Sequence, residues 1–510
     1  MGERGGLVPF LETNVQGRDI DIRSPLWDEA PREEILTLWD EVMAQHHGSL
    51  PSRLDQIESD QRDNIGPISI QAPWAERRDN VLAYFDPVST GSDHLDSHSF
   101  GDIVRELLGE SRNRLRPVGF EHVVSYMQTD TNSGLPRFTR RSSVEGESIE
   151  LAKQQSKEGP ETYPAILGWR GQSGGPNTGD VKQRTVWMFP FSTNIREYRY
   201  FKPLFDVVRT ANWGSAWTDQ DGVNAAVTRM LDSCSGGRVV LSTDFSGYDQ
   251  SISPELQEIF FELIRFAYQG GDLDEVDSLE QIFESIPILC TPDTEISGLH
   301  GVPSGSVFTN ICDSVVHRYL QYVAANELGQ SVDIQQAQVQ GDDGLLCVDS
   351  DVVRTILEIW GSLGFEANPD KQFVGDSDCT YLQRYYTKDH RQNGTIVGIY
   401  PTYRALNSLI SQERFYDPDR WGSDMVTLRT LMILENTKYH PLFEEFVLFT
   451  AKGDKDELGL RNGNLDSIIS PSTISRAKSL PGLVPMYNQE RNIGGIREFE
   501  TYRFLKEQGA

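Results

Sequence analysis

The sequence is poor in cysteine, in long apolar runs and in positive charge. Its five cysteines are scattered and form no Cys-x-x-Cys pair, which excludes a disulfide scaffold and a zinc finger and predicts reduced thiols in a cytosol-like compartment. No apolar run reaches the roughly 18 residues of a membrane helix, so we expect no membrane span. The first residues lack the features of a secretory or myristoylation signal, so we expect neither.

Positive charge is scarce overall but locally concentrated. The chain has 47 Lys and Arg against 76 Asp and Glu, a formal net charge of −29. A nucleic-acid-binding protein usually carries a basic footprint. Between Arg137 and Arg209 the balance reverses, with 12 Lys and Arg against 8 Asp and Glu. An acidic exterior around a basic channel accounts for this pattern; a random fluctuation is the alternative.

The most informative stretch is a pair of aspartates at a predicted hairpin tip. Apolar residues flank Gly341-Asp342-Asp343-Gly344 on both sides, and Asp and Gly favour a tight turn between two strands. Two adjacent carboxylates at such a tip cost stability unless something binds them. An acidic surface turn is the alternative, and this short motif alone does not decide between the two.

A third carboxylate follows another predicted strand. Residues 239–241 are apolar, and the stretch 238–241 predicts a buried strand that leads to Asp244. A carboxylate on such a rigid element is well placed to bind a metal ion. Ser253 and Pro254 then start a predicted helix. Residues 270–296 are acidic, and we expect them to be irregular. A turn or capping role is the alternative for Asp244.

A glycine-rich loop precedes the hairpin. It contains Ser304 and Gly305 and leads into a predicted helix with Thr309 and Asn310 in its first turn. Such a loop can bend and can present N–H groups to a ligand. A loop followed by a core helix is the alternative.

Basic residues gather before these segments. Lys182 and Arg184 alternate on a predicted strand, so both side chains share one face, which suits a triphosphate or an RNA backbone. Arg137 and Arg140 follow a turn and are candidates for contact with a template backbone. A charged strand face and a solvated loop are the respective alternatives.

Taken in order, these features resemble the motifs of viral RNA-dependent RNA polymerases. Asp-x4-Asp from Asp244, Ser-Gly-x3-Thr from Ser304 and Gly-Asp-Asp from Gly341 resemble motifs A, B and C. Three further segments resemble outer motifs of the family, namely 182–184 (motif F), 368–371 (motif D) and 381–384 (motif E). The resemblance covers about residues 170–390. In detail it is closest to the polymerases of double-stranded RNA viruses of the picobirnavirus type, which are partitivirus-like.

The resemblance implies two-metal nucleotidyl transfer from NTPs. Asp244 and Asp342, supported by Asp343, would hold two Mg²⁺ ions, with Mn²⁺ as a possible substitute. Lys371 would act as a general acid toward pyrophosphate. The residues expected to bind the nucleotide are Lys182, Arg184, Asp249, Ser304, Gly305, Thr309 and Asn310. The residues expected to bind RNA are Arg137, Arg140 and Arg384.

Ribose recognition is the point at which the sequence departs from the family. The 2′-OH distinguishes an RNA precursor from a DNA precursor, and Asp249 would accept its hydrogen bond with help from Asn310. Many positive-strand enzymes carry Asn four residues after the motif B Thr, whereas this chain has Asp313 at that position.

The implied fold is α+β, a right hand whose palm is a split βαβ arrangement of antiparallel strands and helices. The predicted division is 1–62 as an extension bridging fingers and thumb, 63–204 and 252–300 as fingers, 205–251 and 301–397 as palm, and 398–510 as thumb and C-terminal segment. The implied enzyme replicates and transcribes a double-stranded RNA genome without a primer. Its expected partners are template and product RNA, NTPs and the capsid protein, and its expected location is the virion interior and the host-cell cytoplasm.

Three other functions compete with this interpretation. A reverse transcriptase or DNA polymerase has the same palm, but it blocks the 2′-OH with a bulky residue, whereas Asp249 is an acceptor. A metal-dependent nuclease explains the aspartates but not the Ser304 loop or the basic strand. A non-catalytic capsid or packaging protein predicts that Asp342 is dispensable.

Overall fold

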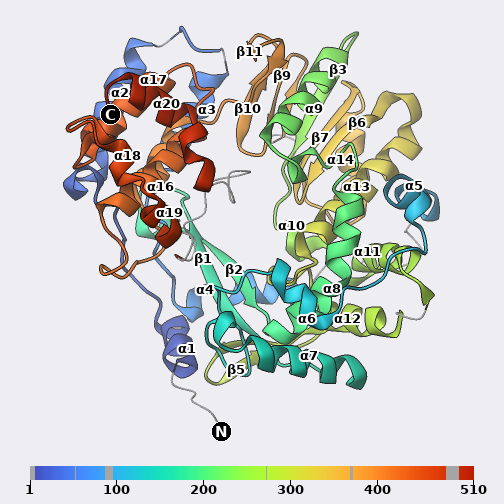
Figure 1. Cartoon of the computed structure of the whole chain (residues 1–510). Coiled ribbons are helices and arrows are strands. Elements are labelled where there is room, and N and C mark those ends of the chain that lie inside the picture. Colours follow the sequence, from blue (N-terminus) through green and yellow to red (C-terminus); the bar gives the residue numbers. More distant parts are fainter. Residues whose placement is uncertain are drawn as a thin grey trace. The chain divides into compact units, whose positions relative to one another are not determined.

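The computed structural model of the chain forms two compact units (Figure 1). It describes residues 6–46, 48–51, 53–86, 96–270, 273–367, 372–477, 480 and 493–510. The first unit contains 1–17, 72–169 and 185–382, and the second contains 18–71, 170–184 and 383–510. Within the described part of the chain, no helix is long and apolar enough to cross a membrane.

A four-stranded antiparallel sheet lies at the centre of the first unit, in the order β6-β7-β3-β8. Its strands are β3 (Arg238–Thr243), β6 (Val332–Gln340), β7 (Asp343–Asp349) and β8 (Phe373–Gly375). Strand β3 pairs with β7 on one side and with β8 on the other. The strands predicted on either side of the Asp342 turn, and the strand predicted before Asp244, are therefore confirmed.

Three helices belong to the same core, namely α11 (Pro254–Ala267), α13 (Thr309–Leu328) and α14 (Val353–Ser362). Ser253 and Pro254 start α11 as predicted. Helix α13 is buried almost throughout, packs against β6 and contacts α11 and α14. The Trp360 indole of α14 donates to the Leu320 carbonyl of α13 over 2.9 Å. An antiparallel sheet with helices packed against it confirms the predicted α+β class.

A second sheet has the order β2-β1-β4-β5. Its strands are β1 (Ala165–Gln172), β2 (Lys182–Met188), β4 (Ile288–Thr291) and β5 (Thr294–Ile296). The prediction that residues 270–296 are irregular is wrong, because α12 (Leu273–Ser285) precedes these two last strands. Val276, Leu279 and Phe283 bury one face of α12, and this apolar spacing within an acidic stretch is what composition alone concealed.

The remaining elements of the first unit are mostly helical. They are α1 (Leu7–Gln16), α4 (Trp74–Leu82), α5 (Ser97–Leu108), α6 (Phe120–Val123), α7 (Glu145–Glu158), α8 (Phe191–Val208), α9 (Gln220–Ser233), α10 (Tyr248–Ser251) and strand β9 (Asp378–Tyr381). Asn14 of α1 donates to the Leu167 carbonyl over 2.8 Å, which ties the first helix to β1 within this unit.

Helices make up most of the described part of the second unit, which also contains residues 170–172 of β1, residues 182–184 of β2 and three short strands. Its helices are α2 (Arg32–Gln45), α3 (Leu54–Asp63), α15 (Thr402–Ile410), α16 (Ser423–Glu435), α17 (Phe443–Gly453), α18 (Leu465–Ile468), α19 (Pro471–Ala477) and α20 (Glu500–Glu507). The three short strands are β10 (Arg384–Thr387), β11 (Arg391–Gln392) and β12 (Thr395–Ile396). The helical character predicted after residue 400 is confirmed.

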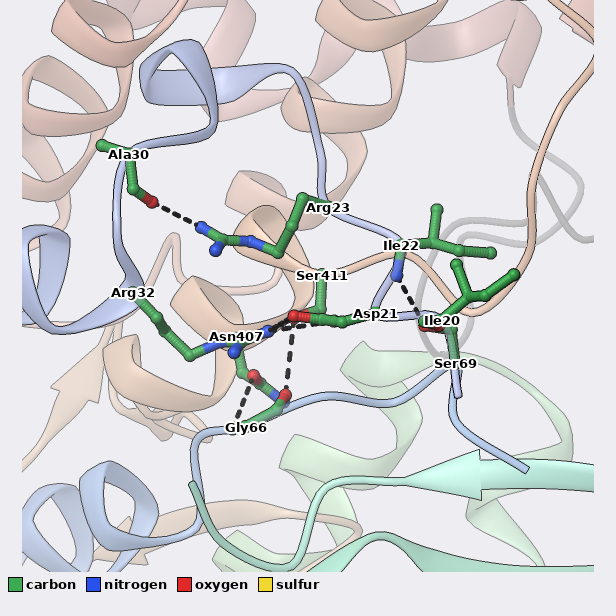
Figure 2. Close-up of polar contacts among 10 residues, drawn as sticks. All are labelled: Ile20, Asp21, Ile22, Arg23, Ala30, Arg32, Gly66, Ser69, Asn407 and Ser411. Carbon is green, nitrogen blue, oxygen red and sulfur yellow. Dashed lines mark hydrogen bonds and ion pairs between the residues drawn. The ribbon is translucent and has the colours of Figure 1, made fainter. Parts of the chain in front are cut away.

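Polar contacts join the early segment of the second unit to its α15 region (Figure 2). The Arg32 guanidinium lies 2.9 Å from an Asp21 carboxylate oxygen and donates to the Ser411 hydroxyl over 2.9 Å. The Gly66 amide donates to Asn407 over 3.3 Å. Residues 18–71 therefore fold with the C-terminal helices, whereas residues 1–17 belong to the first unit. The division into fingers, palm and thumb stays a prediction.

Candidate active site

The paired aspartates lie where the predicted turn reverses the chain. Gln340 pairs with Asp343, so the tip is a two-residue turn of Gly341 and Asp342. Gly341 has φ of +60°, a conformation that glycine adopts without strain and that suits the first central position of a hairpin turn. Asp342 is exposed and Asp343, the first residue of β7, is partly exposed.

Strand register brings the third carboxylate to the same end of the sheet. Thr243 pairs with Gly344, so Asp244 directly follows β3 where Asp343 begins β7. The Asp244 main chain is held on both sides by Gln372, which accepts from its amide over 2.9 Å and donates to its carbonyl over 2.8 Å. This bidentate contact fixes the exposed Asp244 at the strand end.

Carboxylate oxygens are the donors that Mg²⁺ prefers, so the three aspartates fit a divalent ion by chemistry and by backbone placement. Their side chains are not gathered around a common point, since no cluster of three or more His, Cys, Asp or Glu able to hold a metal occurs in the described ranges. The assignment of Asp244, Asp342 and Asp343 as metal ligands therefore stays a prediction.

Behind these exposed groups lies a buried carboxyl. Asp313 of α13 is 6% exposed, and its Oδ1 has no hydrogen-bond partner among the described residues. Burial, followed by the negative charges of Asp249 and Asp342, raises the pKa of Asp313 well above its ordinary value. The Tyr248 hydroxyl donates to the Asp313 carbonyl over 2.9 Å. Asp249, Asp313 and Asp342 thus share one electrostatic environment.

Ser304 and Gly305 are anchored to the backbone of β2. The Ser304 hydroxyl donates to the Thr185 carbonyl over 3.2 Å and accepts from the Trp187 amide over 3.3 Å. A Cβ at Gly305 would lie 1.5 Å from the Trp187 carbonyl oxygen, so only glycine fits. The Thr309 hydroxyl donates to the Pro303 carbonyl over 2.8 Å. These contacts give the motif B loop (residues 303–308) a defined shape.

Sequence reasoning missed the buried acid that also holds this loop. Glu197 of α8 accepts from the Ser306 hydroxyl over 2.6 Å, from the Val307 amide over 2.9 Å and from Asn194 over 3.1 Å. Burial raises the pKa of Glu197 to about 7, against the lowering effect of these hydrogen bonds. Its only sequence signal was an acidic residue within the basic region from Arg137 to Arg209.

Asn310 faces the Asp342 hairpin from the first turn of α13. Its side-chain carbonyl accepts from the Trp217 indole over 3.0 Å and from the Gln340 amide over 3.1 Å. Asn310 as a residue is exposed. The first turn of α13 therefore contacts the strand that leads into the Asp342 turn.

The predicted basic residues fall into three situations. Lys182 and Arg184 are exposed on β2, as their alternation predicted, and they belong to the second unit. Arg137 and Arg140 are exposed, and Arg137 pairs with Glu147 over 2.7 Å. Motif D, with Lys371, lies outside the described residues.

Arg384 is placed differently from what an RNA contact requires. It is 4% exposed and donates to the Asn436 carbonyl over 2.8 Å and to the Asn436 side chain over 3.1 Å. Its guanidinium also lies over the Tyr400 ring. In this position Arg384 stabilises the second unit, so binding of RNA would require it to leave these contacts.

Comparison with known proteins decides the family. Residues 179–397 match the model of the viral RNA-dependent RNA polymerase family. The chain is 37% identical over 477 residues to a potential RNA-dependent RNA polymerase of human picobirnavirus, covering 91% of this chain and 88% of that protein. The chain belongs to the viral RNA-dependent RNA polymerases. The resemblance inferred from the motifs is thereby confirmed.

Two further relatives of this polymerase agree. The crystal structure of a human picobirnavirus RNA-dependent RNA polymerase matches with a TM-score of 0.88 and 34% identity over 99% of this chain and 97% of that one. The RNA-directed RNA polymerase of Cryptosporidium parvum virus 1 is 26% identical over 236 residues, which is 43% of this chain and 44% of that protein. The chain is thus an RNA-directed RNA polymerase of picobirnavirus-like, double-stranded RNA virus type.

Membership of the family has direct consequences for ligands. A viral polymerase of this kind requires a divalent metal ion and binds RNA and nucleoside triphosphates.

Proposed function

We propose that this polymerase replicates and transcribes a double-stranded RNA genome by two-metal nucleotidyl transfer and starts without a primer. The observation that carries the two-metal part is the register of β3 against β7. Because Thr243 pairs with Gly344, one sheet end presents Asp244 next to the Asp342–Asp343 turn. Carboxylates from separate strands at one place are what two-metal phosphoryl transfer needs.

Asp244 and Asp342 would hold two Mg²⁺ ions, for which Mn²⁺ could substitute, and Asp343 would support one of them. When bound, the ions would lower the pKa of the attacking hydroxyl and neutralise charge on the phosphates. The chain supplies a rigid frame, because Gln372 holds the main chain of Asp244 on both sides. Lys371 would donate a proton to the departing pyrophosphate.

Four residues would choose and hold the incoming nucleotide. Lys182 and Arg184 share an exposed face of β2, where two cations can bind a triphosphate. Asp249 would accept a hydrogen bond from the ribose 2′-OH, which a deoxynucleotide lacks. The amide nitrogen of Asn310 would assist, since its carbonyl oxygen is already occupied by Trp217 and Gln340.

The motif B loop and the basic surface residues would serve RNA. Ser304 and Gly305 would let the loop shift as the template advances, and Thr309 would support them. Arg137 and Arg140, both exposed, would contact the template backbone. The product strand would be held by Arg384 after release from Asn436. A capsid protein is the proposed macromolecular partner, and the virion interior and host-cell cytoplasm are the proposed locations.

Template-directed incorporation of labelled NTP with Mg²⁺ tests the catalytic assignment. Asp342→Ala should reduce the rate at least about 1,000-fold, because a ligand that binds the metals directly is lost. Asp293→Ala, which removes an exposed aspartate on the β4–β5 turn, is the control and should keep wild-type activity. Activity that survives Asp342→Ala overturns the assignment of Asp342 as a metal ligand. A preference for dNTPs over NTPs would contradict the proposal that the enzyme synthesises RNA.

Primer independence needs its own experiment. A template with a blocked 3′ end and no primer should still yield full-length product labelled at its 5′ end by the γ-phosphate of the first nucleotide. A product that appears only with an annealed primer would contradict this part of the proposal and leave the two-metal assignment untouched.

A further inference from the structure

Both polar groups of the Gly341 peptide are held by side chains of α13. The Gly341 amide donates to the Ser314 hydroxyl over 2.9 Å, and the Gly341 carbonyl lies 3.0 Å from Nδ1 of His317. Ser314 and His317 are completely buried. We propose that these two residues are positioning residues of the polymerase reaction: they form a turn clamp that fixes the Gly341 peptide and thereby the place of the Asp342 carboxylate.

The contacts determine the direction of every hydrogen bond in the clamp. A carbonyl oxygen can only accept, so Nδ1 of His317 carries the proton that is donated to Gly341. Nε2 then accepts from the Thr243 hydroxyl, 3.3 Å away. The Ser314 hydroxyl donates to the Asn310 carbonyl over 2.7 Å, which leaves its lone pairs for the Gly341 amide. One neutral tautomer of His317 therefore links the motif C turn to the last residue of β3.

Packing leaves the imidazole no alternative position. The rings of Phe245 and Trp360 stand edge-on to His317, with centroids 5.1 and 6.3 Å away. On the opposite strand a Cβ at Gly344 would lie 2.5 Å from Cε1 of His317 and 2.7 Å from the Thr243 hydroxyl oxygen. The second glycine of the Gly-Asp-Asp-Gly tip is thus required by the histidine behind it, and not by the turn.

The clamp acts on the residue that directly precedes Asp342. Hairpin tips in proteins are usually the most mobile part of a hairpin, and Gly341 lacks a side chain that could restrain it. A displacement of about 1 Å at a reacting centre can cost roughly 100-fold in rate. Because Gly341 directly precedes Asp342, holding the Gly341 peptide constrains where the Asp342 backbone lies.

The same helix also carries Asn310, so the clamp connects two parts of the site. The side chain of Asn310 accepts a hydrogen bond from the side chain of Gln340, the residue before Gly341. The main-chain carbonyl of Asn310 accepts one from the Ser314 hydroxyl. A nucleotide that displaces Asn310 would therefore act on the turn through Ser314. This inference rests on the proposed role of Asp342 as a metal ligand.

Substitutions at both clamp residues test the inference. His317→Leu removes both hydrogen bonds, and Ser314→Ala leaves the Gly341 amide without its acceptor. Each should lower kcat about 10- to 100-fold, the usual effect of losing a residue that orients a metal ligand, with KM for NTP changing little. His317→Asn keeps a donor near the Nδ1 position and should recover most of kcat.

Binding of Mn²⁺ without nucleotide, followed by electron paramagnetic resonance, gives a second measurement that does not depend on turnover. We expect the apparent Kd for Mn²⁺ to rise about 10-fold in His317→Leu and in Ser314→Ala, and to be nearly restored in His317→Asn. In the wild-type protein, the ¹⁵N shifts of the His317 ring should identify the neutral tautomer protonated at Nδ1.

His300 provides a matched control. It is also completely buried, and its two ring nitrogens contact the Gly301 and Ile286 carbonyls, remote from the carboxylates in sequence. His300→Leu should reduce thermal stability as His317→Leu does but should leave Mn²⁺ affinity unchanged.

The clamp is overturned if Ser314→Ala and His317→Leu keep kcat and Mn²⁺ affinity within about 2-fold of wild type, a change too small for the loss of a residue that orients a metal ligand. If Asp342→Ala is also active, the proposed function fails as well; if it is inactive, only the clamp fails.

Discussion

Acidic residues of the site have two different roles, set by their exposure. Asp244 and Asp342 are exposed, so they can face a cation from solution. Asp313 and Glu197 are buried, and burial raises the pKa of both carboxyls. A buried carboxyl serves as a hydrogen-bonding group within the fold, as Glu197 does for the motif B loop. A count of aspartates near a motif does not distinguish these roles.

At the residue scale, the two cations of β2 give a prediction about substrate affinity. Lys182→Ala and Arg184→Ala should each raise KM for NTP about 5- to 30-fold, because one charge-assisted contact to phosphate is lost, which is worth about 1–2 kcal/mol. Steady-state incorporation kinetics at varied NTP concentration measure the effect. Lys157→Ala, an exposed lysine at the end of α7, should leave KM unchanged. A fall in kcat alone would contradict triphosphate binding.

At the scale of elements, the motif B loop is held between two supports. Ser304 bonds to the backbone of β2, and Glu197 of α8 accepts from Ser306 and Val307. A loop that must shift during the reaction is therefore attached at separate points, each through a few hydrogen bonds. Any change in the charge of Glu197 alters one support and leaves the other intact.

Glu197 also gives this element a defined dependence on pH. The pKa of Glu197 is about 7 in the folded chain against an ordinary value of 4.5. Between pH 4.5 and about pH 7 the folded state therefore keeps a proton on Glu197 that the unfolded state releases. The stabilisation is fully present below pH 4.5 and is lost as the pH rises through about 7, with a slope near 1.4 kcal/mol per pH unit. Urea unfolding at pH 5, 6 and 7 should therefore show Glu197→Gln gaining on the wild type as the pH rises. A constant difference would contradict the raised pKa.

A second element-scale prediction concerns the start of α15. Glu58 of α3 is 1% exposed, accepts from the Thr402 amide over 2.7 Å and the Tyr403 amide over 3.1 Å, and lies 2.9 Å from Nε2 of His440. Glu58→Gln places an amide against these donors and should cost about 2–3 kcal/mol of unfolding free energy.

Denaturant unfolding of the second unit measures this cost. Glu34→Gln replaces an exposed acid of α2 and should change the unfolding free energy by less than about 0.5 kcal/mol. An equal effect of the two substitutions would show that Glu58 does not cap α15.

At the scale of the whole molecule, a net charge of −29 makes salt act in two opposite directions. Added salt screens the repulsion among acidic residues and should raise Tm. The same salt weakens contacts between cations and RNA phosphates and should lower RNA affinity. Thermal melting and fluorescence anisotropy with labelled RNA, both from about 50 to 300 mM NaCl, should show the opposite trends. A Tm that falls with salt would contradict the first expectation.

The features that the sequence predicted correctly are those whose pattern lies within a short stretch of the chain. The strand before Asp244, the hairpin at Asp342 and the alternation of Lys182 and Arg184 follow from patterns within ten residues, and all three are confirmed. Helix α12 was missed because acidic composition concealed its apolar face. Arg384 was expected to bind RNA, and its burial was not foreseen because a motif fixes residue type but not burial.

The contacts that hold the site could not be predicted from local sequence patterns. Glu197 precedes the Ser306 loop by 109 residues, and Gln372 follows Asp244 by 128. Long-range partners of this kind depend on tertiary packing. His317 did carry a weak local signal, because it continues the polar row of Asn310, Asp313 and Ser314 at helical spacing.

The turn clamp has a consequence for how the enzyme moves. A hairpin tip usually exchanges its amide hydrogens with solvent quickly, but the Gly341 amide is buried against Ser314 and should be among the slowly exchanging amides of the first unit. The turn that carries Asp342 would then be the part of the enzyme that moves least, and the surrounding loops would have to move at each advance along the template. Deuterium uptake measured for single peptides tests this expectation: residues 339–345 should label slowly and residues 303–308 should label faster.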